Sequence, residues 1–181
     1  MKVRYVKLLC LTLCLCMLSC GVLAGCSEEM YTNALTSTEV SSQLLAALPD
    51  GGKSFLRMET DYISESRFGE RYEELLTRCY TSSVILTALD VSASADQIGI
   101  FHANNEADAE IVLEIIEEYV ETETRKLRDA YEMYAKDEVV KLDNARVKVC
   151  GTYILYTFLS KEDTETVQNA FEEALRIPNQ A

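Results

Sequence analysis

The sequence is poor in the residue types that build most metal and nucleophilic sites. It contains one histidine, His102, and no tryptophan. Of its seven cysteines, only Cys79 and Cys150 lie beyond residue 26. Zinc sites need about four ligands at short, characteristic spacings, and two isolated cysteines with one histidine do not supply them. No metal ion or other cofactor is expected.

The N-terminus has the pattern of an exported protein. Lys2, Arg4 and Lys7 precede the apolar run 8–24, which contains no charged residue. A basic start followed by a short apolar run is typical of a secretory signal peptide. The run lies at the lower limit for a permanent membrane-spanning helix, which needs about 20 residues. We therefore predict a signal peptide over residues 1–25.

The residues that end this run match the lipobox recognised by lipoprotein signal peptidase. They read Leu23-Ala24-Gly25-Cys26, with two small residues before a cysteine whose thiol can carry diacylglycerol. We predict cleavage before Cys26, acylation of its thiol, and a lipid-anchored protein on the extracytoplasmic face of the cell membrane. Two or three acyl chains hold a protein stably, whereas one is marginal. A plain secreted protein and an uncleaved anchor are the alternatives.

The charge of the mature chain excludes nucleic acid as a partner. The formal net charge is −13, and loss of the three basic residues of the signal peptide lowers it to −16. Such a surface repels phosphate backbones and anionic lipid headgroups. The domain is therefore expected to hang from its lipid anchor rather than lie on the membrane.

The remaining chain predicts a lipidated tether over residues 26–37 and one α+β domain over residues 38–178. Apolar periodicity and capping residues predict several helices. One starts near Thr36, a long one spans 106–134, a short one lies near 137–142, and the last one follows Ser160 or Asp163. β-branched and aromatic residues predict two hairpins, 83–91 with 97–103 and 146–150 with 152–160. Residues 53–80 are ambiguous. A weak helical face there consists of Tyr72, Leu75, Leu76, Cys79 and Tyr80.

The expected fold is an antiparallel sheet of two hairpins, with the long amphipathic helix between them and helices packed on one face. Three segments carry a family resemblance: residues 95–101, the long helix ending at Tyr131 and Tyr134, and residues 142–155. They resemble an uncharacterised family of Firmicute, mainly clostridial, lipoproteins (domain of unknown function 4358). Two departures are Gln97, where the family usually has Glu, and Lys136, near which it usually has Pro. The resemblance implies a small surface lipoprotein and supplies no activity.

Several residues suggest chemistry but have a plainer structural explanation. Gly51-Gly52-Lys53-Ser54 lacks the upstream glycine of a phosphate-binding loop and is better explained as a turn. His102 has no accompanying nucleophile motif, so an ordinary strand-end histidine is favoured over a general base. A solvated helix face, rather than a calcium site, is favoured for Glu110, Glu114, Glu117, Glu118 and Glu121. A core role, rather than a ligand groove, is favoured for Tyr119, Tyr131, Tyr134, Tyr153 and Tyr156.

Two questions remain open from sequence. Outside the cytosol a disulfide between Cys79 and Cys150 is chemically allowed, and two buried thiols behaving as apolar side chains are the favoured alternative. The expected function is a non-enzymatic, membrane-tethered module that binds an envelope protein, peptide or glycan. The alternative is an envelope hydrolase or modifying enzyme with carboxylates such as Asp90, Asp96 and Glu106, which would have to face one another across a cleft.

Overall fold

The computed structural model describes residues 30–60, 68, 78–88, 90 and 92–178. In these ranges none of the helices combines the length and the apolar character needed to cross a membrane. The elements, in chain order, are α2 (Ser37–Ala47), β1 (Phe55–Thr60), β2 (Tyr80–Ala88), β3 (Gln97–Ala103), α5 (Glu106–Tyr134), α6 (Lys136–Asp143), β4 (Arg146–Cys150), β5 (Tyr153–Phe158) and α7 (Lys161–Leu175).

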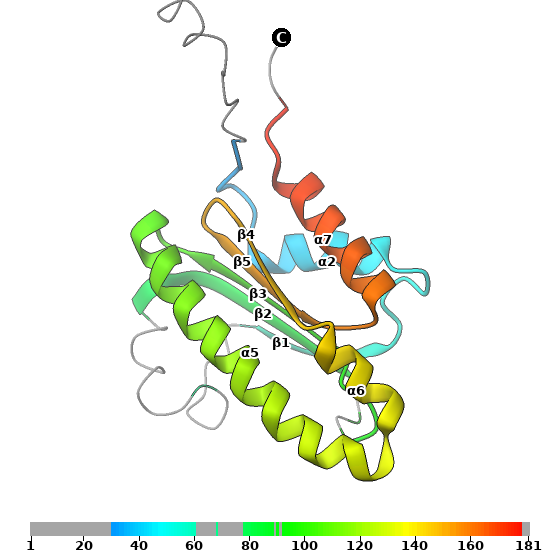
Figure 1. Cartoon of the computed structure of the whole chain (residues 1–181). Helices are drawn as coiled ribbons and strands as arrows, with labels where there is room; N and C mark the ends of the chain where they lie inside the picture. The colour runs from blue at the N-terminus through cyan, green and yellow to red at the C-terminus, as the bar shows by residue number, and fades with distance from the viewer. Residues whose placement is uncertain (1–29, 61–67, 69–77, 89, 91, 179–181) are drawn as a thin grey trace, which may run out of the picture.

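The described strands form one antiparallel sheet in the order β1-β2-β3-β5-β4 (Figure 1). The hairpins β2–β3 and β4–β5 are the two that the sequence predicted. The connection from β3 to β5 contains α5, α6 and β4, and it places β5 between β3 and the edge strand β4. β1 extends the sheet beyond β2 in a stretch where the sequence was ambiguous. The weak helical face falls mostly in 69–77, outside the described residues, and its last residue, Tyr80, begins β2.

The helices are divided between the two faces of the sheet, whereas the sequence analysis placed them on one face. α5 and α6 cover one face, and α2 and α7 cover the other (Figure 1). The reason is that every residue of β3 is buried, and successive residues of a strand point to opposite faces. Ile98 and Ile100 pack towards α2 and α7, while Phe101 packs towards α5. The α+β class, the antiparallel sheet and the long helix between strand groups are confirmed.

Capping side chains fix the helix starts that the sequence indicated. Thr36 and Glu39 form a reciprocal capping box at the start of α2. The side chains of Asn105 and Ser160 each accept a backbone N–H three residues further along, at the starts of α5 and α7. These bonds satisfy donors that a helix terminus otherwise leaves without a partner.

The two ends of the described chain meet at one end of the sheet. Tyr31 forms an antiparallel bridge with Arg176. On either side of this bridge, the Thr32 N–H donates to the Leu175 carbonyl and the Ile177 N–H donates to the Met30 carbonyl, both at 2.8 Å. The N-terminal segment is thereby fixed to the end of α7.

The same segment also packs on the β4–β5 turn. A Cβ atom at position 151 would lie only 3.1 Å from the Cβ of Tyr31. Gly151 also has φ +59, a conformation that favours glycine. The Tyr153 hydroxyl donates to the Leu35 carbonyl at 2.5 Å. Residues 30–36, which the sequence analysis assigned to the tether, therefore lie against the domain.

Candidate functional site

One pocket lies where the end of α2, the start of β1 and the start of α7 meet the β2–β3 turn. We call it the distal pocket, and its volume is about 240 Å³. Its apolar part includes the buried side chains of Leu48 and Leu159. The complete lining consists of Leu48, Pro49, Asp50, Ser54, Phe55, Asp96, Leu159 and Asp163. An apolar surface with three carboxylates and a hydroxyl suits a ligand that carries cationic or hydroxyl groups.

The carboxylates of the distal pocket are held by local hydrogen bonds. Asp50 accepts the backbone N–H groups of Gly52 at 2.8 Å and Ser54 at 2.9 Å. These bonds lower the pKa of the Asp50 carboxyl, because they stabilise its charged form. Asp163 accepts the Ser160 hydroxyl at 2.7 Å. The pocket therefore presents preorganised oxygen atoms.

The third carboxylate, Asp96, is positioned by a network from α6. The ammonium of Lys141 lies 2.8 Å from an oxygen of Asp96 and 2.9 Å from an oxygen of Glu138. Glu138 also accepts the Ala95 N–H at 2.7 Å. Burial alone would lower the pKa of Lys141, but its bonds to the two carboxylates raise that pKa overall. The network fixes the β2–β3 turn to α6 and so shapes one wall of the pocket.

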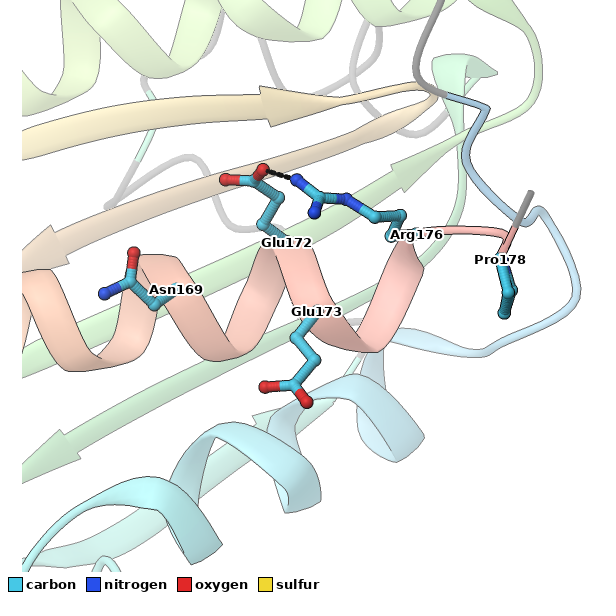
Figure 2. A pocket seen from close by; sticks show the side chains of 5 residues that line it. All are labelled: Asn169, Glu172, Glu173, Arg176 and Pro178. Atoms are coloured by element: carbon cyan, nitrogen blue, oxygen red, sulfur yellow. Dashed lines mark hydrogen bonds and ion pairs between the residues drawn. The ribbon is translucent and has the colours of Figure 1, made fainter.

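A second pocket, of about 500 Å³, lies along the end of α7 at the opposite end of the sheet. We call it the proximal pocket. Asn169, Glu172, Glu173, Arg176 and Pro178 line it, and Figure 2 shows Arg176 reaching back to Glu172. Glu172 also contacts the ammonium of Lys148 in β4 at 2.6 Å, and this cation lowers the pKa of the Glu172 carboxyl. Here the ionic groups largely satisfy one another.

The structure does not bring together the carboxylates suggested for an enzyme. Asp90 is exposed in the β2–β3 turn and accepts the Ser92 hydroxyl at 2.6 Å. Asp96 precedes β3, and Glu106 follows its far end at the start of α5. A strand of this length separates the last two by about 20 Å. Only Asp96 belongs to the distal pocket.

His102 is a packed strand residue. It is buried and stacks on Tyr153, with ring centroids 4.0 Å apart and an interplanar angle of 13°. Burial lowers the pKa of His102, so the neutral imidazole is favoured. On β2 it faces Ser82, whose hydroxyl oxygen lies 3.0 Å from that of Ser37. The favoured interpretation, a histidine at the end of a strand, describes this environment.

Cys79 and Cys150 are both buried, and neither forms a disulfide. Cys79 belongs to the hydrophobic cluster under α5, whereas Cys150 belongs to the cluster under α2 and α7. The sheet lies between these two clusters. The disulfide is therefore absent, and the alternative of two apolar thiols describes the structure.

The tyrosine and glutamate patterns also have structural explanations. Four of the five tyrosines that we assigned to the core are buried, and Tyr134 is the exception. The five glutamates of α5 that were considered for a calcium site are all exposed: Glu110, Glu114, Glu117, Glu118 and Glu121. Over the part of the chain that the structure describes, no group of three or more acidic, histidine or cysteine side chains is arranged to hold a metal ion. Residues 51–54 form a turn, with positive φ at Gly51 and Gly52.

Sequence reasoning missed a buried polar cluster on the α5 face. The hydroxyls of Tyr119 and Tyr156 both donate to the side-chain oxygen of Gln97 at 2.8 Å. The partners are 22 and 59 residues from Gln97 along the chain, so no local pattern joins them.

The signal peptide, the lipobox residues 23–25 and Cys26 lie outside the described residues.

These features define an α+β protein with one antiparallel sheet, helices on both faces and a pocket near each end of the sheet. A family model described as Domain of unknown function (DUF4358) matches residues 62–159, and the chain belongs to this family. No curated protein and no solved structure matched the chain in the same comparisons.

Proposed function

We propose that the protein is a lipoprotein held on the extracytoplasmic face of the cell membrane by an acylated Cys26, and that its domain is a non-enzymatic binding module. We further propose that it is one of the lipoproteins of Firmicute, mainly clostridial, bacteria. The N-terminal pattern supports the anchor. The alternative of an envelope hydrolase has less support, because its suggested carboxylates are spread over both ends of β3.

The observation that carries the proposal is the separation between the N-terminal segment and the distal pocket. Tyr31 packs beside the β4–β5 turn, and β5 runs from that turn to Phe158. Leu159, which lines the distal pocket, follows the far end of β5. A strand of this length spans about 20 Å. A chain anchored shortly before Met30 would therefore present its distal pocket away from the membrane.

The chemistry of the distal pocket defines the class of ligand. Its carboxylates disfavour anions, and its apolar side chains provide contact area for an organic group. We propose that it binds a cationic or hydroxyl-bearing group of an envelope protein, peptide or glycan. The net charge of the chain is consistent with such a partner and opposes nucleic acid.

The anchor is tested by fractionating cells that express the wild-type chain or a Cys26→Ala variant. We expect the wild type in the membrane fraction, with an acylated N-terminal peptide beginning at residue 26 in its mass spectrum. The Cys26→Ala variant should accumulate as an unprocessed precursor. Normal cleavage and release of this variant would refute the lipoprotein assignment.

The binding role is tested by placing a photo-crosslinking amino acid at one position in each pocket of the wild-type chain in intact cells. Ser54 is exposed beside the distal pocket, and Asn169 is exposed beside the proximal pocket, so the two sites are matched. We expect a reproducible adduct from position 54 and none from position 169. Adducts from position 169 alone would show that the distal pocket is not the binding site.

A further inference from the structure

Two exposed apolar side chains stand next to each other where the N-terminal segment joins the domain. Met30 is 56% exposed and Ile177 is 39% exposed. The Ile177 N–H donates to the Met30 carbonyl, and the adjacent residues Tyr31 and Arg176 form the antiparallel bridge. Residues opposite each other in an antiparallel pair have side chains on the same face, about 5 Å apart. We call Met30 and Ile177 the apolar pair.

The length of chain before the apolar pair limits what can cover it. Met30 is four residues after Cys26, and four extended residues reach at most about 14 Å. If Cys26 carries lipid, as proposed above, the apolar pair lies within reach of the headgroup region. From these positions we infer that the apolar pair contacts the lipid bilayer and holds the domain end-on, with the distal pocket facing away from the membrane. The inference rests on the proposed anchor.

The contact is apolar rather than electrostatic. Arg176, the neighbour of Ile177 in the chain, and Lys148 of β4 are both engaged with Glu172. The start of α5, with Glu106 and Asp108, lies at this same end of the sheet, because His102 near the end of β3 pairs with Tyr153. These carboxylates disfavour anionic headgroups. The bilayer contact therefore depends on insertion of the Met30 and Ile177 side chains into the membrane–water interface.

The anchor makes such a small contact sufficient. A short flexible linker gives an effective concentration in the millimolar range or above, so a second contact needs little affinity of its own. Two side chains that would not hold a free protein on a bilayer can therefore set the orientation of a tethered one. By contrast, the exposed side chains of Met133, Tyr134 and Val140 lie on the last turn of α5 and on α6, near the distal end.

The absence of tryptophan provides a direct test. We would purify the full lipidated chain as Ile177→Trp or Val140→Trp and reconstitute each in phosphatidylcholine vesicles with brominated acyl chains, which quench nearby indole fluorescence. Val140 is a matched control, because it is 57% exposed at the distal end. We expect at least twofold stronger quenching in the Ile177→Trp protein. Equal quenching in the two proteins, or none in either, would overturn the inference.

Flotation of the vesicles separates this inference from the proposed anchor. Flotation without quenching at position 177 would support the lipid anchor and refute the bilayer contact of the apolar pair. Failure of the protein to float would refute both proposals. Raising the salt concentration from about 0.1 to 1 M shortens the screening length from about 10 to 3 Å. We expect the quenching to persist, and its loss at high salt would show an electrostatic contact and contradict the apolar one.

Discussion

Gly99 of β3 lies opposite Tyr156 of β5, and the tyrosine ring occupies the space above the glycine. A Cβ at position 99 would approach a ring carbon of Tyr156 to 1.9 Å, far inside van der Waals contact. The ring is fully buried, and its hydroxyl donates to Gln97. The absence of a side chain at position 99 therefore allows the Tyr156 ring to lie across β3 and reach its hydrogen-bond acceptor.

Gly99→Ala is expected to destabilise the protein by about 1–3 kcal/mol, the usual cost of overpacking a core. The added methyl group must displace the Tyr156 ring, which also strains its bond to Gln97. Chemical denaturation of both proteins measures the difference. The same substitution in a Tyr156→Leu background should cost less, because the clashing ring is gone. A change below about 0.5 kcal/mol in the wild-type background would contradict the clash.

Local signals in the sequence were sufficient for the helices. Asn105 caps α5, and the periodic apolar residues after it predicted the bounds 106–134 that the structure shows. Thr36 indicated the start of α2 in the same way, and of the two caps predicted for α7, Ser160 and Asp163, the structure shows Ser160. These signals worked because a helix start depends on residues within one turn.

The features that sequence reasoning missed depend on residues far apart in the chain. The distal pocket takes Asp50 from the loop after α2, Asp96 from the β2–β3 turn and Asp163 from α7. The position of β5 between β3 and β4 also comes from non-local pairing. The continuous burial of β3 indicates two covered faces, whereas the expectation from the sequence was that the helices pack on one face.

Lys141→Met is expected to destabilise the protein by about 1–2 kcal/mol, between the costs of a surface and a buried ion pair. The substitution leaves Asp96 and Glu138 without their shared cation. Lys126→Met is the matched control, because Lys126 is exposed and forms a surface ion pair with Glu123 on the same helix. The control should cost about 0.5 kcal/mol or less.

The contribution of Lys141 to the free energy of unfolding should disappear at alkaline pH. The folded-state pKa of Lys141 is raised, above an unfolded value of about 10.4. The stabilisation is therefore complete below that pH and is lost as the pH rises through the folded pKa. The free energies of unfolding of the wild type and Lys141→Met, measured by chemical denaturation, should differ most at pH 8 and least at strongly alkaline pH. A difference that grows with pH would contradict this assignment.

A reducing agent is expected to leave the thermal stability of the chain unchanged, because Cys79 and Cys150 lie on opposite faces of the sheet and are not joined by a disulfide. In a chain starting at Ser27, a thiol reagent should label both cysteines after unfolding and label them slowly before it. Burial, together with the charge of Asp108, raises the pKa of the Cys79 thiol and so also slows its reaction. Met133→Cys, at a position 79% exposed, is the control for fast labelling. Resistance of the unfolded chain to labelling until it is reduced would show a disulfide.

His102 is expected to make the protein less stable as the pH falls. Burial lowers the folded-state pKa of His102, below an unfolded value of about 6.5. The unfolded chain then binds more protons, so stability is lost as the pH falls from about 6.5 through the folded pKa. His102→Phe can preserve the stacking on Tyr153 and does not titrate, so it should lose less stability between pH 7.5 and 5.

Comparing the two proteins separates His102 from the thirty acidic residues, which also begin to titrate near pH 5. Because the chain has one histidine, the imidazole proton resonances can be followed by nuclear magnetic resonance without assignment. A titration midpoint below that of a model peptide is expected. A midpoint above it, or a greater loss of stability in His102→Phe on acidification, would mean that a partner favours the charged imidazole. The packing against Tyr153 would then not be the dominant influence on this residue.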